Sequence, residues 1–235
     1  MVPVHTLSGV EAAFVLANTG LAAPPCLPEL RMYLGDDVTG VWERTEAAFG
    51  PDRPPPFWAF AWAGGQAVAR YVLDHPETVA GRGVLDIAAG GGVVAVAAAV
   101  AGAATVTASD IDRLAIAAIG LNAEANGVTV EARLADLLDD PWRSAGDDVT
   151  VVLAGDVCYS REMTGRVLRL LDQAAERGAT VLLGDPGRAY LPTDRLTALA
   201  RYQVPVTHDL ESTAVKHTTV WRPAGAGAAA GNHDR

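Results

Sequence analysis

The sequence has little cysteine, no excess of positive charge and no long apolar run. Its only two cysteines, Cys26 and Cys158, are far apart, which argues against a disulfide framework or a cysteine-based metal site and suits a reducing compartment. The net charge is −10 with no basic cluster, which disfavours a nucleic-acid partner because the phosphate backbone is itself anionic. The longest apolar run, residues 93–101, is too short to cross a bilayer, and no signal peptide is evident at the start. We therefore expect a cytoplasmic protein with no membrane, nucleic-acid or metal partner.

Half of the 235 residues are apolar and they are spread along the chain, which is enough for one medium-sized domain. Short apolar runs alternate with helical segments, and this alternation predicts an α/β fold with a mostly parallel sheet covered on both faces. The expected strands are 84–88, 105–110, 128–136, 149–156 and 179–187, followed by a closing pair at 204–212 and 217–223. The expected helices are 65–76, 93–102, 113–126, 161–177 and 194–202.

The chain divides into three regions. Residues 1–56 are expected to form an N-terminal extension, irregular apart from short helices at 11–19 and 29–34. Residues 57–223 form the main domain, which follows the stiff connector PDRPPP at 51–56. Residues 224–235 are expected to be a disordered tail.

The segment VLDIAAGGG at 84–92 joins a predicted strand to a predicted helix through a cluster of glycines. Gly90 and Gly92 allow a tight turn and leave the backbone open to a ligand, since ligands of such sheets bind beyond the carboxyl ends of the strands. A dinucleotide and S-adenosylmethionine both fit such a turn, and a purely structural turn is the alternative. Asp86, ahead of the glycines, would face a pyrophosphate unfavourably but suits a ligand with an ammonium group and a sulfonium.

Two further acids end predicted strands. Asp110 ends the strand at 105–110, where it can hold both ribose hydroxyls, and Asp136 ends the strand at 128–136, where it can bind the adenine amino group. Both also precede helical segments, so helix capping is the alternative for each. Together with Asp86 they predict a nucleoside cradle and favour S-adenosylmethionine over a dinucleotide.

The motifs VLDIAAGGG, ASDID and LAD resemble the successive cofactor motifs of class I, Rossmann-like methyltransferases. That family's pattern is acid-x-Gly-x-Gly-x-Gly, so the chain departs from it at Ala88, where we expect ordinary backbone angles. The resemblance implies a mostly parallel seven-stranded sheet that ends in an antiparallel hairpin.

A narrower resemblance is carried by FWAFAWAGGQAVARYVLDHP, GDVCY, GDPGR and the late LEST and TTVW. These segments are similar to those of the lysine methyltransferases that modify the β subunit of electron transfer flavoprotein, over roughly residues 30–221. Ala63 replaces the proline usual after the second tryptophan. The resemblance implies S-adenosylmethionine as cofactor and a protein substrate. The expected cofactor residues are Trp62, Gly64, Gly65, Asp86, Ala88, Gly90, Gly92, Asp110, Ile111, Asp136 and Ala154.

The acceptor side is expected at GDVCY, because this segment follows the strand beside the first one. Asp156 is predicted to orient the acceptor amine and Tyr159 to shape the pocket; the alternative is a helix-capping Asp156 and a core Tyr159. Cys158 is interpreted as a packed small residue rather than a nucleophile. The other expected substrate residues are Trp58, Asp185 and Arg188. The alternative for Trp58 and Trp62 is a hydrophobic lid over the sheet edge. The alternative for Asp185 and Arg188 is a structural turn with an Asp–Arg pair.

The sequence therefore predicts an N-methyltransferase acting on a protein lysine, with electron transfer flavoprotein β subunit as the expected substrate. A small-molecule N- or O-methyltransferase shares the same cofactor motifs and stays open. A binding module without transfer is disfavoured by the intact acids, and a dehydrogenase by Asp86. The sequence leaves the number of methyl groups and the oligomeric state open.

Overall fold

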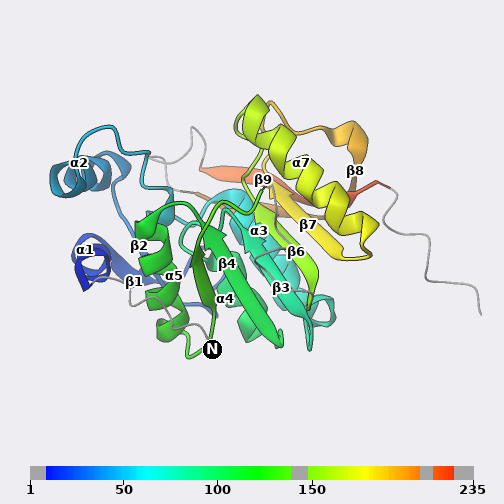
Figure 1. Cartoon of the computed structure of the whole chain (residues 1–235), viewed down its shortest axis with the longest axis horizontal. Helices are drawn as coiled ribbons and strands as arrows, with labels where there is room; N and C mark the ends of the chain where they lie inside the picture. Colours follow the sequence, from blue (N-terminus) through cyan, green and yellow to red (C-terminus); the bar gives the residue numbers. More distant parts are fainter. Residues whose placement is uncertain (1–8, 139–147, 207–213, 225–235) are drawn as a thin grey trace, which may run out of the picture.

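A seven-stranded mixed sheet forms the centre of the protein, as seen in a computed structural model that describes residues 9–138, 148–206 and 214–224 (Figure 1). The strand order is β5-β4-β3-β6-β7-β9-β8. The first five strands pair in parallel, whereas β9 is antiparallel to both β7 and β8. The strands are β3 (Gly83–Ile87), β4 (Thr105–Asp110), β5 (Glu131–Leu134), β6 (Val149–Gly155), β7 (Thr180–Asp185), β8 (Leu196–Pro205) and β9 (Val215–Pro223). The predicted fold class is confirmed.

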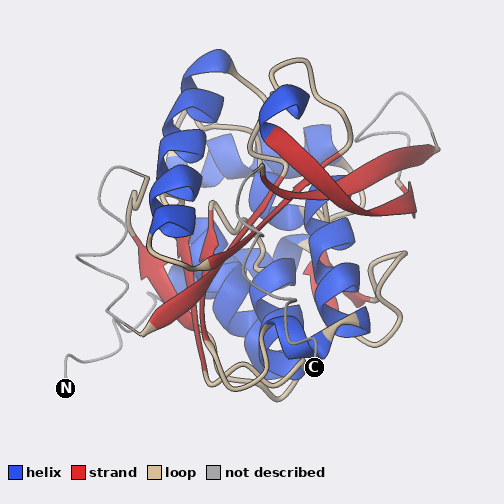
Figure 2. Cartoon of the chain, turned by 90° about the vertical axis from the view of Figure 1, so that its right-hand side faces the viewer, coloured by secondary structure: helices blue, strands red, loops and turns tan. Residues whose placement is uncertain are grey.

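Helices cover both faces of the sheet (Figure 2). Side chains of α3 (Ala63–Asp74), α4 (Val93–Val100) and α5 (Arg113–Ala125) join one buried cluster, and those of α7 (Arg161–Glu176) join another. Successive residues of a strand point to opposite faces. Val84 accordingly joins the α3–α4 cluster and Leu85 the α7 cluster, so the next residue, Asp86, points toward α4. Within the described residues, no helix combines the length and apolar character needed to cross a bilayer.

The N-terminal region packs beside α5 at one edge of the molecule, drawn in blue in Figure 1. It consists of α1 (Gly9–Asn18), β1 (Gly20–Ala22), β2 (Met32–Leu34) and α2 (Val38–Phe49), and the short helix η1 (Phe57–Ala59) leads into the main sheet. The predicted helix at 29–34 is wrong, because residues 32–34 pair with β1 as a short antiparallel ribbon. Helix α2 was not predicted; the Asp37 carboxylate caps its start by accepting the Gly40 N–H at 3.0 Å.

The C-terminal hairpin corrects a second expectation. Residues 194–202 do not form a helix: a short helix, η3 (Thr193–Arg195), is followed by β8. The register runs from Leu196 opposite Pro223 to Pro205 opposite Val215, so pairing with β9 determines the local structure. The predicted strand at 204–212 therefore starts earlier and ends at Pro205, and residues 207–213 lie outside the described part of the chain.

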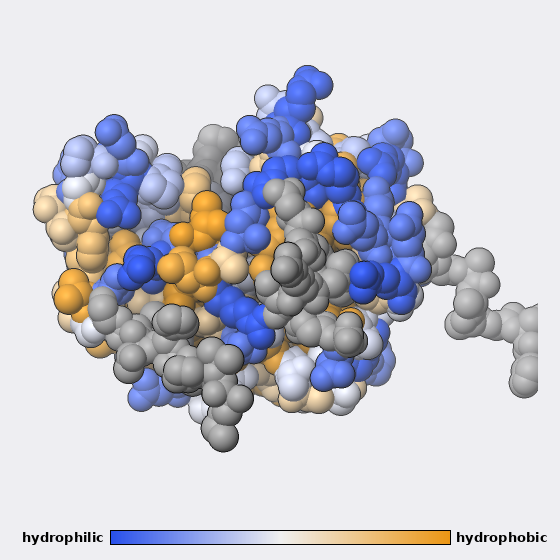
Figure 3. Space-filling view, in the orientation of Figure 1, coloured by the Kyte–Doolittle hydropathy of each residue, from blue (hydrophilic) through white to orange (hydrophobic). Residues whose placement is uncertain are grey.

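The remaining elements lie close to their predicted positions. The strand at 105–110 and the helix starting at residue 113 are confirmed, whereas β5 is shorter than the predicted 128–136. A short helix, η2 (Pro76–Thr78), follows α3. On the face shown in Figure 3, the surface is hydrophilic over α7 and carries apolar side chains near α5 and β4. Apart from residue 224, the predicted disordered tail lies outside the described residues.

Candidate active site

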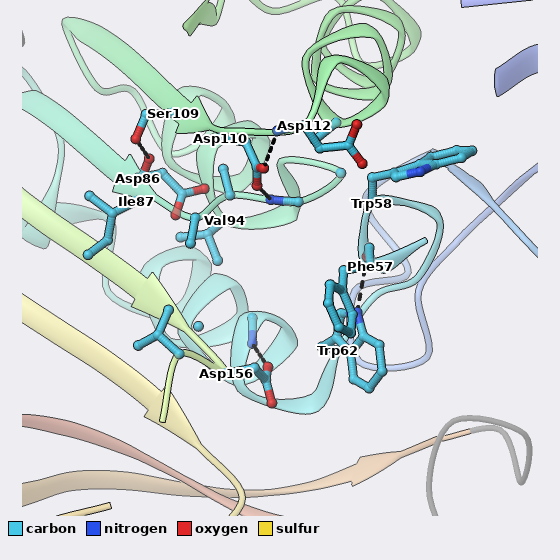
Figure 4. A pocket seen from close by; sticks show the side chains of 18 of the residues that line it. Phe57, Trp58, Trp62, Asp86, Ile87, Val94, Ser109, Asp110, Asp112 and Asp156 are labelled. Atoms are coloured by element: carbon cyan, nitrogen blue, oxygen red, sulfur yellow. Dashed lines mark hydrogen bonds between the residues drawn. The ribbon is translucent and has the colours of Figure 1, made fainter. Parts of the chain in front are cut away.

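A cavity of about 430 Å³ opens at the carboxyl ends of β3, β4 and β6 (Figure 4). Its wall includes carboxylates from these strand ends, Asp86, Asp110 and Asp156, and Asp136 from beyond β5. Because the strand order is β5-β4-β3-β6, the four acids follow one another along the edge of the sheet as Asp136, Asp110, Asp86 and Asp156. Neighbouring strands are about 4.8 Å apart, so Asp136 and Asp156 lie toward opposite ends of this row.

The glycine turn after β3 contains three left-handed residues, Ala88 at φ 49°, Gly90 at 53° and Gly92 at 79°. Ordinary backbone angles were expected at Ala88, and that expectation is wrong. A left-handed conformation costs an alanine about 1–2 kcal/mol. Gly91 and Gly92, later in the same turn, are needed for packing. A Cβ on Gly91 would lie 2.6 Å from the Trp58 carbonyl oxygen, and one on Gly92 would lie 2.9 Å from Ile119.

Asp86 is 1% exposed, and its Oδ2 accepts the N–H of Ala95 at 3.0 Å, inside the first turn of α4. Burial raises the pKa of this carboxyl to about 8, and the nearby charge of Asp110 acts in the same direction. A cation bound in the cavity would therefore stabilise the charged form of Asp86.

Asp110 organises the backbone around the glycine turn. Its Oδ2 accepts the Gly90 N–H at 2.9 Å and its Oδ1 accepts the Asp112 N–H at 3.0 Å. The N-cap of α5 is Asp112, which accepts the Leu114 N–H at 2.9 Å, so the capping role considered for Asp110 belongs to its neighbour. Burial raises the pKa of Asp110, and its backbone hydrogen bonds oppose that shift.

Asp136 and Ile111 form the far end of the cavity wall. Asp136 accepts the Leu138 N–H at 3.1 Å and pairs with Arg166 at 2.9 Å. An ionised carboxylate has about four acceptor positions, so each oxygen keeps capacity for a ligand. Ile111 is 73% exposed, which leaves an apolar surface open beside these polar groups.

Asp156 follows β6 in a left-handed conformation, with φ 58° and a side chain that is 10% exposed. Its Oδ2 accepts the Gly65 N–H of α3 at 2.9 Å, and its Oδ1 pairs with Arg188 Nη2 at 2.8 Å. Burial raises the pKa of Asp156, and Arg188 opposes that shift. The N-cap of α7 is Ser160, so Asp156 does not cap the helix that follows it. Its carboxylate instead accepts a backbone N–H in the first turn of α3.

Three aromatic rings, those of Phe57, Trp62 and Tyr159, line the same cavity as Asp156, and Figure 4 labels the first two. Phe57 and Tyr159 are 45% and 55% exposed and stack with ring centroids 6.3 Å apart, and Phe57 meets Trp62 edge-on at 5.7 Å. Trp58 is 1% exposed and packs against Phe14, so most of its side chain belongs to the core. Sequence reasoning missed Phe57, although it begins the aromatic block.

The pair Gly64–Gly65 lets α3 lie directly on the sheet. A Cβ on Gly64 would collide with the Gly184 carbonyl oxygen and lie 2.6 Å from Asp156 Oδ2. Gly65 reaches the cavity wall, whereas four of the expected site residues lie behind it in the described structure: Gly64, Gly92, Ala154 and Asp185. Cys158 is buried, and burial raises the pKa of its thiol to about 11, in keeping with a packed residue rather than a nucleophile.

Several known proteins are similar to this chain. A sequence profile of the ribosomal protein L11 methyltransferase (PrmA) family matches residues 71–176. The chain is 35% identical over 215 residues to the electron transfer flavoprotein β subunit lysine methyltransferase of Danio rerio, covering 89% of this chain and 81% of that one. It is 32% identical over 220 residues to the same enzyme of Homo sapiens, covering 89% and 80%. Ribosomal protein L11 methylase from Lactobacillus delbrueckii subsp. bulgaricus matches with a TM-score of 0.49 at 18% identity, covering 70% and 80%.

The sheet order, the acids at successive strand ends and these relatives define an S-adenosylmethionine-dependent methyltransferase of class I. Within that class, the chain belongs to the electron transfer flavoprotein β subunit lysine methyltransferase family.

Proposed function

We propose that this enzyme transfers a methyl group from S-adenosylmethionine to a lysine side chain of a protein, with electron transfer flavoprotein β subunit as the substrate. The observation that carries the proposal is the position of Asp156 in the wall of the donor cavity, which the exposed rings of Phe57 and Tyr159 also line. Aromatic faces and a carboxylate suit an alkylamine, because both attract its nitrogen end while the rings contact its methylene chain.

The cavity residues fit the methyl donor. The Asp110 carboxylate keeps acceptor positions that would hold the two ribose hydroxyls, Ile111 would offer an apolar surface to the adenine ring, and Asp136 would accept from the adenine amino group. The turn formed by Ala88 and Gly90 would hold the methionine end near Asp86, whose buried carboxyl would be matched by a cationic ligand.

The other five expected cofactor residues are Trp62, Gly64, Gly65, Gly92 and Ala154. Trp62 and Gly65 belong to the cavity wall, and Gly64 packs against Gly184 beside it, whereas Ala154 is buried in the cluster that packs against α7. Gly92 begins α4 with a left-handed conformation and supports the turn.

When bound, S-adenosylmethionine supplies a methyl group activated by a sulfonium. The residues of this chain then have to position the acceptor and exclude water. Asp156 accepts a hydrogen bond from the amine N–H and so orients the nitrogen lone pair, and the rings of Tyr159 and Phe57 confine the alkyl chain. Asp185 holds the following turn by accepting the N–H groups of Gly187 and Arg188, both at 2.7 Å.

The test is mass spectrometry of purified flavoprotein β subunit after incubation with the enzyme and S-adenosylmethionine carrying a tritiated methyl group. We expect label in the protein fraction and added methyl mass on lysine. The matched variants are Asp156→Asn, in the site, and Asp172→Asn, at a surface ion pair with Arg195. A β subunit that gains neither label nor methyl mass would refute it as the substrate. In a parallel incubation with a whole lysate, label transferred only to a small-molecule product would show that the acceptor is not a protein.

A further inference from the structure

The side chain of Arg188 occupies the place beside Asp156 where a cationic acceptor would bind. Its Nη2 lies 2.8 Å from Asp156 Oδ1, and its guanidinium carbon is 5.9 Å from the ring centroid of Trp62. The backbone of Arg188 is fixed as well, because its N–H and that of Gly187 both donate to Asp185 Oδ1. The turn after β7 thus presents a guanidinium to the carboxylate that ends β6.

Arg188 also separates two spaces. Together with Tyr159 it lines both the large cavity and a second, open hollow of about 290 Å³. The charged side chains in the described wall of this hollow are both cationic, Arg188 and Lys216. An acceptor that reaches Asp156 from this side approaches past positive charge, which disfavours an ammonium and tolerates an uncharged amine.

The groups around Asp156 define its charge. Burial raises the pKa of Asp156 and so disfavours the ionised carboxylate, as does Asp185 at the end of β7, whereas Arg188 and the Gly65 N–H at the start of α3 favour it. The Cys158 thiol, with a pKa raised to about 11, is uncharged at neutral pH, and burial raises the pKa of the Tyr159 phenol. On the opposite wall, the charged groups are Asp86, Asp110, Asp112, Asp136 and Arg166. Within this set, Arg188 is the cation in contact with Asp156.

We propose that Arg188 selects the uncharged form of the acceptor amine: it holds the cation position at Asp156, so that the amine binds as the free base and donates an N–H to this carboxylate. The inference rests on the proposed amine-methylating function. The acceptor ammonium gives its proton to water before it enters. The nitrogen lone pair forms the N–C bond, the C–S electron pair stays with sulfur, and the methylammonium product releases a proton to water. Arg188 acts through Asp156 and is a positioning residue.

A free lysine has a pKa of about 10.4, and a nearby charge within about 4–6 Å shifts a pKa by about 1–3 units. If Arg188 repels the ammonium, the kcat of the wild-type enzyme reaches its plateau about 1–3 pH units below 10.4. In Arg188→Gln, the acceptor ammonium takes the vacated position, so the rising limb of kcat moves to higher pH by at least about one unit. At pH 7.5 kcat falls about tenfold or more, while KM for the acceptor stays equal or decreases.

The experiment measures kcat and KM from pH 6 to 10.5 with flavoprotein β subunit as acceptor. Arg188→Lys retains a cation and should restore most of the wild-type profile. Arg195→Gln is the matched control, since Arg195 pairs with Asp172 at 2.6 Å on the surface, outside both cavity walls of the described structure. An Arg188→Gln profile that superimposes on the wild type, or a loss of kcat that is equal at every pH, overturns the proposal. A wild-type limb at or above pH 10.4 overturns it without any variant.

A second measurement separates this inference from the identity of the substrate. The complex with S-adenosylhomocysteine is titrated calorimetrically with n-butylammonium at pH 7, for the wild type and for Arg188→Gln. The proposal expects at least tenfold tighter binding by the variant, and equal affinities overturn it. If the β subunit is not methylated, the proposed function fails, while this titration still decides the role of Arg188.

Discussion

Replacing Asp110 by asparagine tests the donor side of the cavity. Two charge-assisted hydrogen bonds from the ribose hydroxyls are expected at this carboxylate, each contributing about 1.5–3 kcal/mol. Asparagine retains one acceptor oxygen and loses the charge, so one of these bonds is lost and the other weakened. Both oxygens of Asp110 also accept backbone N–H groups, from Gly90 and Asp112, so the amide NH₂ faces a donor. We expect binding to weaken by about 2–4 kcal/mol, or roughly 30- to 1,000-fold in Kd.

The assay is calorimetric titration of the variant with S-adenosylhomocysteine. Asp112→Asn is the matched control, because it removes a carboxylate from the same wall, and asparagine is as good an N-cap as aspartate. We expect the control to lose far less affinity than Asp110→Asn. A folded Asp110→Asn protein that binds as tightly as the wild type refutes the assignment of the ribose to Asp110.

Three further predictions concern stability. Gly64→Ala should lower the Tm by about 5 °C or more, since the added Cβ collides with the Gly184 carbonyl. Gly165→Ala, in α7, should not lower it, because the atom nearest to the added Cβ is 3.9 Å away. Equal Tm changes in the two variants would contradict the packing argument. Ala88→Gly should raise the Tm by about 1–4 °C by relieving its left-handed conformation, and Ala101→Gly, at φ −74°, should lower it. Because the pKa of Asp86 is raised from 3.8 to about 8, the native state holds a proton there that the unfolded state has lost between these pH values. The stability of the ligand-free protein therefore falls as the pH rises from 3.8 to about 8. Asp86→Asn should reduce this pH dependence in thermal melts from pH 5 to 8, and an unchanged slope would argue against a raised pKa at Asp86.

The sequence predicts the central sheet well because the buried parallel strands are continuous apolar runs. Strands β6 and β7 are examples, and the glycines and acids at their ends mark the site. The helix predicted at 194–202 is wrong because an edge strand with one exposed face has no distinctive apolar pattern. The conformation of this segment follows from its pairing with β9.

The local roles of the site residues depend on contacts that no sequence pattern contains. Gly64 and Gly184 are far apart in the chain, yet each excludes a side chain on the other, so a glycine expected at the cofactor serves helix–sheet packing. The pairing of Arg188 with Asp156 depends on the turn after β7, in which Asp185 accepts the backbone N–H of Arg188. Ala88 adopts a left-handed conformation because the backbone of the turn is fixed on both sides.

The most direct test of the account compares binding and transfer in Asp156→Asn, whose amide oxygen can still accept the Gly65 N–H. The enzyme is saturated with S-adenosylmethionine, and methyl transfer to flavoprotein β subunit is followed in a single turnover. We expect affinity for S-adenosylhomocysteine within about threefold of the wild type and a rate lowered by about 100-fold or more, as for loss of an interaction with the reacting group. Transfer at the wild-type rate would contradict the claim that Asp156 orients the acceptor nitrogen.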